Sequence, residues 1–418
     1  MDRTTITNYV FQDKPLITSH HEAALSNCLD AAINNPFFSK TNLLASIPLS
    51  ADTALPSLRL LTSLINTLPG SWPTFDLSCC FSRLWNLLPE DVKSGRDTQH
   101  NSLLDGLSQQ MKNTYTDVCS LLPESDTPAI YGASSSNPLN HKKLHNFVKN
   151  FSLPIQQTAG TRSTVALALP NGPVLGLALL ATSTYYTAAP VTVASGPEQF
   201  QSDVMQAGAS VVLVTKPDVQ RLGLQDAWVH EAGIQVILVE SKEDSTFNMT
   251  FSNGSPLVVN SKASPNGSDD IALVLFTSGT SGKKKVVPYT VHTIISGVAF
   301  VIESWGLTKD DICINMMPLF HVGGIVRNLF APIMAGGSTI CCPAFDANLF
   351  WDVVEDLQPT WYYASPSMHS VILEEGRNRP SALENSKMRL ICNAAGGLLP
   401  SLAITLRDTF KCIVLPSY

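Results

Sequence analysis

The chain has few charged residues and no long uninterrupted apolar run. Charged residues make up 15% of its 418 residues, and acidic residues outnumber basic ones, 34 to 27. A general nucleic-acid binder normally presents a broad basic surface, so no nucleic-acid partner is expected. The most apolar stretch, residues 165–194, is interrupted by Pro170, Asn171 and Pro173. It therefore predicts a strand, a turn and a buried helix, and no transmembrane segment is expected.

The cysteines lack the spacing of a metal-binding framework, because no two of them form a CxxC pair. The nine residues are Cys28, Cys79, Cys80, Cys119, Cys313, Cys341, Cys342, Cys392 and Cys412. An odd number of cysteines in a large chain predicts reduced thiols in a cytosolic-type compartment. The opening MDRTTITNYVFQDKPL has no apolar signal-peptide core, so a cytoplasmic location is expected.

Short apolar runs alternate with segments of helical length from about residue 164 onward. The predicted strands are 164–169, 210–215, 234–240, 271–276, 311–316, 338–342, 360–364, 389–394 and 412–416. The predicted helices are 174–188, 199–207, 291–305 and 402–410. Near-continuous apolar strands separated by helices are typical of parallel sheets covered on both faces. We predict an α/β fold with at least two stacked or adjoining sheets.

The first 125 residues carry helical patterns without any catalytic constellation. Helices are predicted at 55–68 and 102–122, and the second has an apolar stripe at three- and four-residue steps. Such a stripe fits a helix packed on a core or, alternatively, a partner-binding helix. We predict a mostly helical accessory region of unknown role. A polar segment, 241–270, is predicted to be a surface excursion.

The stretch LFTSGTSGKKK, residues 275–285, places hydroxyls, glycines and lysines directly after an apolar strand. Backbone N–H groups in such a loop can turn inward as an anion-binding nest, and its glycines permit the positive φ angles required. A lysine adds a compact charge suited to phosphate. The stretch is not a Walker A loop, because Thr277 stands where GxxxxGK(S/T) requires glycine, and Lys284 follows Lys283 in place of a hydroxyl residue. By itself the stretch fits either a phosphate loop or a solvated turn.

The same loop resembles the phosphate-loop signature of the adenylate-forming superfamily, which includes acyl-CoA synthetases, luciferases and the adenylation domains of peptide synthetases. That signature reads (S/T)-(S/T)-G-(S/T)-(S/T)-G-x-P-K, where x is any residue. Lys285 takes the final lysine position, and Lys284 stands where proline is usual. The resemblance implies that the ATP phosphates are bound by Thr277, Ser278, Gly279, Thr280, Ser281, Gly282 and Lys285.

Further landmarks follow in the family's order. The segment MPLFHVGGIVRNLFAPIMAGGSTI, 317–340, resembles the family's PLFHxxG region, which implies that His321 lies beside the acyl group and the adenylate. The segment NAAGGLLP, 393–400, resembles the loop that lines the acyl pocket and approaches adenine. Tyr418 stands where the YGxTE motif opens, with the tyrosine that stacks on adenine. The resemblance thus assigns the adenine and acyl pocket to Ala395, Gly396, Gly397 and Tyr418.

The resemblance extends upstream to residues 129–151 and 165–181, which are similar to the family's opening strand–helix pair and its LPNGP turn. It implies the N-terminal core of the adenylate-forming fold over residues 126–418, with parallel sheets flanked by helices. This core is expected to be incomplete, because the rest of YGxTE and the family's mobile C-terminal domain, with its catalytic lysine, do not occur in the sequence. Residues 1–125 form the accessory region.

The chemistry that the resemblance implies is ATP-dependent activation of a small carboxylic acid as an acyl-adenylate, for transfer to CoA or phosphopantetheine. His321 and Lys285 would be the catalytic residues. Mg²⁺ would arrive with ATP, with Thr280 as the candidate ligand in this chain. Two alternatives remain within the family: an adenylation module of a larger peptide-synthetase-like enzyme or carboxylic acid reductase, with carrier or neighbouring domains as partners, and a non-catalytic nucleotide- or acyl-binding remnant. A purely structural α/β protein is the third.

Residues around the predicted acyl pocket bear on the acid. Those expected to surround it are apolar and favour a hydrophobic or aromatic acid: Phe320, Val322, Trp361, Tyr362 and Met368. The stretch 321–329 contains no carboxylate to hold an α-amine, which argues against an α-amino acid. Arg327 fits either a surface position or a contact to a second carboxylate on the substrate.

Overall fold

The computed structural model describes residues 23, 25–29, 40–67, 74–90, 117–134, 137–155, 162–259, 262–277 and 284–416. The chain divides into two compact units. The first takes residues 1–116, 267–269 and 295–306, and the second takes residues 117–266, 270–294 and 307–418. No helix among the described residues is long and apolar enough to cross a membrane.

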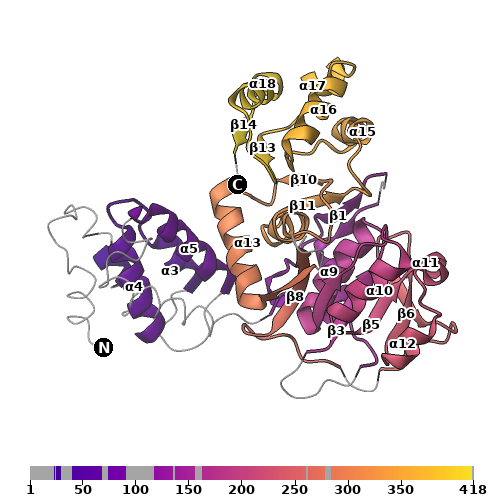
Figure 1. Ribbon diagram of the computed structural model, residues 1–418. Helices are drawn as coiled ribbons and strands as arrows, with labels where there is room; N and C mark the ends of the chain where they lie inside the picture. Colours follow the sequence, from indigo (N-terminus) through magenta and orange to yellow (C-terminus); the bar gives the residue numbers. More distant parts are fainter. Residues whose placement is uncertain are drawn as a thin grey trace. The chain divides into compact units, whose positions relative to one another are not determined.

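The described part of the first unit is helical. It contains α3 (Lys40–Ser46), α4 (Ala54–Thr67), α5 (Thr74–Leu87) and most of α13 (Val291–Trp305) (Figure 1). An ion pair between Arg83 and Glu303 joins α5 to α13. The helix predicted at 55–68 is confirmed. The helix predicted at 102–122 lies mostly outside the described residues. Its described end, residues 117–122, contains a short 3₁₀ turn, Cys119–Leu121.

The second unit contains two seven-stranded sheets. The first sheet has the strand order β7-β6-β5-β3-β4-β8-β9. Its strands are β3 (Thr164–Ala168), β4 (Thr187–Pro190), β5 (Ala209–Val214), β6 (Gln235–Ser241), β7 (Phe247–Phe251), β8 (Ile271–Thr277) and β9 (Lys285–Thr290). The second sheet has the order β14-β13-β12-β10-β11-β1-β2. Its strands are β1 (Pro128–Gly132), β2 (Leu139–Asn140), β10 (Ile312–Asn315), β11 (Ser338–Cys341), β12 (Trp361–Ala364), β13 (Leu390–Asn393) and β14 (Ile413–Leu415).

Pairing within both sheets is parallel except at three edge strands, β2, β7 and β9. All nine predicted strands are confirmed, and so is the two-sheet α/β architecture. The prediction that 241–270 is only a surface excursion is wrong in part, because β7 lies within it and pairs with β6. Phe247, Met249 and Phe251 alternate with polar residues there, the period of a half-buried edge strand.

Helices cover the sheets as the apolar patterns predict (Figure 1). The helices of the second unit are α8 (His141–Asn150), α9 (Pro173–Tyr185), α10 (Pro197–Gln206), α11 (Lys216–Arg221), α12 (Ala227–Glu231), α14 (Ala331–Met334), α15 (Ala347–Leu357), α16 (Pro366–Gly376), α17 (Pro380–Glu384), α18 (Pro400–Phe410) and the π-helix η3 (Gly323–Phe330). A core of residues from α10, α12, β3 and β5 packs on one face of the first sheet. A second core joins α15, α16 and α18 to β10, β12 and β13.

Helix α9 lies between the two sheets, contacting β3, β4 and β8 of one and β1 and β11 of the other. Gly176 allows this close approach, since a Cβ there would lie 3.2 Å from Leu329 and 3.4 Å from the Cys341 sulfur. Nearly every side chain of α9 is buried. The apolar composition of this stretch therefore reflects a helix covered by protein on both sides.

Candidate nucleotide and acyl site

The predicted phosphate loop connects β8 to β9. Thr277, the last residue of β8, pairs across the antiparallel ladder with Lys285, the first residue of β9, and both are exposed. Five predicted phosphate-binding residues lie outside the described part of the chain: Ser278, Gly279, Thr280, Ser281 and Gly282. The structure thus fixes the two ends of the loop and shows that its final lysine faces solvent.

Lys284 anchors one end of this loop to helix α10. Its ammonium lies 2.6 Å from a carboxylate oxygen of Asp203, whose side chain is only 2% exposed. The side-chain amide of Gln206, also on α10, donates to the Lys284 carbonyl. The Lys284 ammonium also lies 5.8 Å from the centroid of the Phe276 ring, near the other end of the loop. An ion pair thus holds the position where the family usually has proline, and sequence reasoning missed its buried partner, Asp203.

We expect Lys284→Met to lower the free energy of unfolding by about 2 kcal/mol, because it leaves the Asp203 carboxylate buried without its cation. Lys285→Met is the matched control, since Lys285 is exposed, and it is expected to change stability by less than about 0.5 kcal/mol. Urea denaturation of the two variants makes the comparison. Equal midpoints would show that the Lys284 ion pair does not hold the loop.

The PLFHVGG segment forms a braced turn that leads into η3. The Asn315 side chain donates to the Gly324 carbonyl at 3.0 Å and accepts from the Met317 N–H at 3.2 Å. A Cβ on Gly324 would lie 2.4 Å from the Pro318 carbonyl oxygen, so only glycine fits there. π-helical turns occur frequently at functional sites, and this one begins two residues after His321.

His321 is exposed at the start of this turn, with the Phe320 ring 4.7 Å from its own. Neighbouring protein atoms displace part of its solvent, and this desolvation lowers the pKa of His321 below its usual value. The shift favours a neutral imidazole at pH 7. Such a ring can donate one hydrogen bond and accept another beside a reacting carboxylate.

A cavity of about 590 Å³ lies next to this segment, between the two sheets. Residues that follow β3 and β4 form one side of it, and residues that follow β10, β11 and β12 form the other. The lining comprises Leu169, Pro170, Asn171, Leu175, Pro190, Val191, Thr192, Val193, Ala194, Met316, Met317, Pro318, Phe320, Pro343, Ala344, Phe345, Ser365 and Met368. The carboxyl ends of parallel strands are where α/β proteins usually bind ligands.

Asn171 ties the two sides of this cavity together. Its side-chain amide donates to the Cys342 carbonyl at 2.7 Å, and its side-chain oxygen accepts from the Leu319 N–H at 2.8 Å. One side chain after β3 therefore fixes two segments of the second sheet. The sequence signalled only a turn here, because the partners of Asn171 are distant in the chain.

The glycine loop after β13 lies beside the end of β12. Ala395 has the left-handed φ of 57°, and the Asn393 side chain donates to the Gly396 carbonyl across it. A Cβ on Gly396 would lie 3.7 Å from Pro366, the first residue of α16. Ala395 and Gly397 are exposed. Tyr418, the predicted adenine contact, lies outside the described residues.

Three of the five expected pocket residues do not line the cavity. Phe320 and Met368 line it, and Val322 is exposed. Trp361 and Tyr362 do not line this cavity but are buried, and Tyr362 belongs to the core under the second sheet. These two rings therefore do not shape this cavity, because β12 is covered on both faces.

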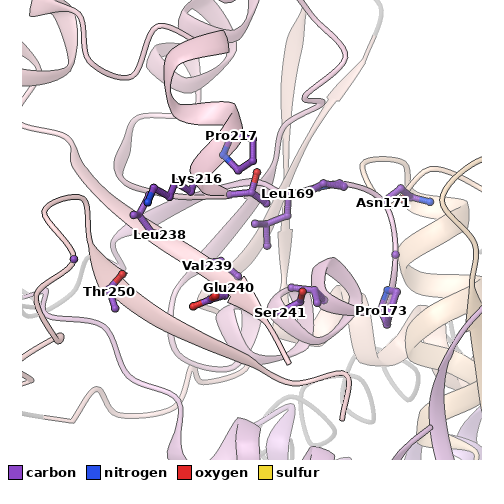
Figure 2. A pocket seen from close by; sticks show the side chains of 15 residues that line it. Leu169, Asn171, Pro173, Lys216, Pro217, Leu238, Val239, Glu240, Ser241 and Thr250 are labelled. Carbon is purple, nitrogen blue, oxygen red and sulfur yellow. The ribbon is translucent and has the colours of Figure 1, made fainter. Parts of the chain in front are cut away.

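A second cavity, of about 710 Å³, lies at the carboxyl ends of β3, β5 and β6 (Figure 2). Strand β3 connects through α9 to β4 on one side, whereas β5 connects through α11 and α12 to β6 on the other. Between β3 and β5 the direction of the connections therefore reverses, which is a common place for a ligand in such sheets. Lys216 and Glu240 bring opposite charges to its walls (Figure 2). Sequence reasoning did not identify this cavity.

Comparison with known proteins agrees with this arrangement. The sequence model of the AMP-binding enzyme family matches residues 123–418, so the chain belongs to that family. The chain is similar to an oxalate–CoA ligase of Arabidopsis thaliana, at 28% identity over 67% of this chain and 55% of the relative. It is also similar to an oxalate–CoA ligase of Saccharomyces cerevisiae, at 25% identity over 72% of this chain and 58% of the relative.

Among solved structures, apo MatB from Rhodopseudomonas palustris superposes with a TM-score of 0.58 at 18% identity, covering 72% of this chain and 59% of that chain. This likeness shows the fold of the adenylate-forming N-terminal core. The chain spans a little over half the length of the two curated relatives.

Proposed function

We propose that the chain carries the ATP- and acid-binding part of a ligase that activates a carboxylic acid. A carboxylate oxygen attacks the α-phosphorus of ATP, the acyl-adenylate forms and pyrophosphate leaves. The thiol of CoA, or of phosphopantetheine on a carrier protein or neighbouring domain, then attacks the acyl carbon and AMP leaves. Membership of the AMP-binding family and the similarity to CoA ligases support this proposal.

The observation that carries the proposal is that the strand leading into the predicted phosphate loop ends at the same edge of the sheet as residues that line the inter-sheet cavity. Strands β4 and β8 are parallel neighbours, with Ala188 opposite Leu273, so their carboxyl ends lie at the same edge of the sheet. The loop follows β8, and the residues after β4, Val191 to Ala194, line the cavity. An acid in the cavity would thus meet a nucleotide whose phosphates are held at the loop.

In this proposal Lys285 stabilises the charge on the phosphates, and His321 contacts the junction between acid and adenylate. Mg²⁺ is proposed to enter with ATP, bound to its phosphates. Thr280 stays the candidate ligand in the loop. Gly396 and Gly397 are proposed to form pocket wall, and Tyr418 to face adenine.

Acid-dependent ATP–pyrophosphate exchange tests the proposal. The acids should include aryl, fatty and dicarboxylic examples, since the two curated relatives are named for oxalate, an acid with two carboxylates. Exchange is expected with at least one acid. Lys285→Ala is expected to lower kcat/KM by about 100-fold or more, the effect of removing one donor to developing charge. Lys387→Ala, at an exposed lysine of the second unit, is the control and should be unchanged.

Other outcomes separate the alternatives. ATP binding that Lys285→Ala abolishes, with no exchange for any acid, would identify a nucleotide-binding part without the first half-reaction. ATP affinity that Lys285→Ala leaves unchanged, again without exchange, would contradict the proposal.

A further inference from the structure

We propose that Arg327, positioned by Tyr363, binds a second anionic group on the acid, so that the substrate is a short dicarboxylic acid. This inference rests on the proposed function, because it assigns one end of the same acyl site. It replaces the expectation of a hydrophobic or aromatic acid, which depended partly on Trp361 and Tyr362.

The guanidinium of Arg327 is held in one orientation. It projects from η3, its Nη1 donates to the hydroxyl of Tyr363, and its central carbon lies 5.2 Å from the centroid of the Tyr363 ring. Tyr363 is only 6% exposed, so the ring is a fixed platform. An arginine fixed in this way loses little conformational freedom when it binds a carboxylate.

Most donors of this guanidinium have no partner in the described part of the chain. A guanidinium carries five N–H groups, and the contact to Tyr363 is the one hydrogen bond that Arg327 makes there. No carboxylate lies within ion-pair distance among the described residues. The arginines that do form ion pairs with carboxylates in the second unit differ in this respect; they are Arg162, Arg221, Arg379, Arg389 and Arg407.

Partial burial makes this lack of a counter-charge informative. Arg327 is half-buried, and a cation withdrawn from water is destabilised until an anion or a hydrogen-bond acceptor replaces the lost water. A planar carboxylate can accept two parallel N–H groups from one guanidinium. The pair Arg327–Tyr363 therefore has the features of a carboxylate-binding group.

The pair lies beside the segment that carries His321, although neither residue lines the inter-sheet cavity itself. A Cβ on Gly323 would be 2.9 Å from the Tyr363 ring, so this ring packs against the bare backbone at the start of η3, just after His321. On its other side, Tyr363 pairs with Cys392 of β13, the strand that leads into the glycine loop. The Tyr363 ring thus contacts the start of η3, and its backbone belongs to the strand that neighbours β13.

Helix geometry limits the length of the acid. The π-helix η3 begins two residues after His321, and long side chains on helices lean back toward the N-terminus. The Arg327 guanidinium therefore reaches back toward His321, as its contact to Tyr363 beside Gly323 shows. A diacid with few carbons between its carboxylates fits this span better than a fatty acid does.

The test is ATP–pyrophosphate exchange with diacids and their monoamides, which are near in shape but carry one charge fewer. The pairs are oxalate and oxamate, malonate and malonamate, and succinate and succinamate. At least one diacid is expected to exceed its monoamide in kcat/KM. Arg327→Met should lower kcat/KM for that diacid by about 10- to 100-fold, which is the usual effect of losing a hydrogen bond to a charged group. It should leave kcat/KM for the monoamide unchanged.

Two variants and one control sharpen the result. Arg327→Lys should recover only part of the preference, since an ammonium cannot make the paired contact. Tyr363→Phe should raise KM for the diacid more than it lowers kcat, because it only loosens the guanidinium. Arg407→Met, which removes a surface arginine paired with Asp408, should retain the wild-type preference. Exchange that favours monocarboxylates, with no change of preference in Arg327→Met, would overturn the inference and leave the proposed function standing.

A binding measurement decides the case without turnover. With ATP present, a diacid is expected to raise the melting temperature of the wild-type chain and not that of Arg327→Met. If no acid supports exchange, this difference still supports the inference while the proposed function fails. The absence of any diacid-dependent shift in the wild-type chain would overturn the inference.

Discussion

Asp311→Ala is expected to lower the free energy of unfolding by about 3 kcal/mol, the lower end of the range for removing one partner of a buried ion pair. Asp311 precedes β10 and is 2% exposed. Its two carboxylate oxygens each lie 2.6 Å from a nitrogen of the Arg389 guanidinium. Because the Arg389 side chain is 39% exposed, solvent limits the cost of leaving it unpaired.

The same carboxylate connects three strand entries of the second sheet. It accepts from the Thr308 N–H and from the Thr360 hydroxyl, each at 2.8 Å, while Arg389 immediately precedes β13. Burial would raise the pKa of Asp311, but the bonds from Arg389, Thr308 and Thr360 hold it below the usual value. The loss of Asp311 therefore unties the starts of β10, β12 and β13 together.

The adjacent residue provides the control for this prediction. Asp310 is 78% exposed and pairs only with exposed Lys309, so Asp310→Ala should change stability by less than about 0.5 kcal/mol. Urea denaturation at pH 7 measures both variants. A similar unfolding midpoint for Asp310→Ala and Asp311→Ala would refute the role given to the Arg389 pair.

The second large effect is a loss of stability in mild acid caused by His369. This residue of α16 is fully buried, with its Nδ1 3.2 Å from the Tyr362 hydroxyl. Burial lowers the pKa of His369 to about 4, whereas histidine in an unfolded chain titrates near pH 6.5. Between these values the unfolded chain binds the proton and the folded chain does not, so stability falls as the pH falls from about 6.5 to 4.

The size of this effect follows from the two pKa values. A difference of about 2.5 units corresponds to roughly 3 kcal/mol of stability, present above pH 6.5 and absent below pH 4. Burial lowers the pKa of His141 as well, which adds to the loss in the same direction. Asp311 contributes only below about pH 3.9, where its carboxyl titrates in the unfolded chain.

His369→Leu is expected to flatten the pH dependence of stability between pH 6.5 and 4 by about 3 kcal/mol, whatever its constant effect at neutral pH. His230→Gln, at an exposed histidine, should keep the wild-type dependence. Urea denaturation across this range measures the slopes. A slope for His369→Leu equal to that of the wild-type chain would show that another group causes the acid sensitivity.

Much of the architecture could be predicted because parallel strands that are covered on both faces appear in the sequence as continuous apolar runs. Strands such as 210–215 and 389–394 needed no tertiary information. β7 was missed since an edge strand has only one covered face and a polar alternation. The helix at 291–305 was predicted, but its division between two compact units depends on contacts that no local pattern reports.

The site could be predicted only where chemistry is local in sequence. The phosphate loop and His321 were predicted from motifs of consecutive residues, and their roles remain proposals. Lys284 looked like a departure from the family, and its compensation by Asp203 lies far back along the chain. Strand β12 has the sequence WYYA, in which no polar alternation marks one face, and neighbours in a strand point to opposite faces. Tyr362 enters the core and Tyr363 meets η3, a distinction that depends on which face each helix covers.

The two hydrogen bonds of Asn171 join residues 148 and 171 positions apart. Each sheet is held together mainly by pairing between its own strands. The bonds of Asn171 instead join distant parts of the chain and so close a chain loop that spans much of the second unit. Long loops cost more entropy to close, and contacts across them tend to form late. The inter-sheet cavity thus depends on contacts between the sheets. Separating the sheets there would abolish the cavity while leaving the hydrogen-bonded ladders of both sheets intact.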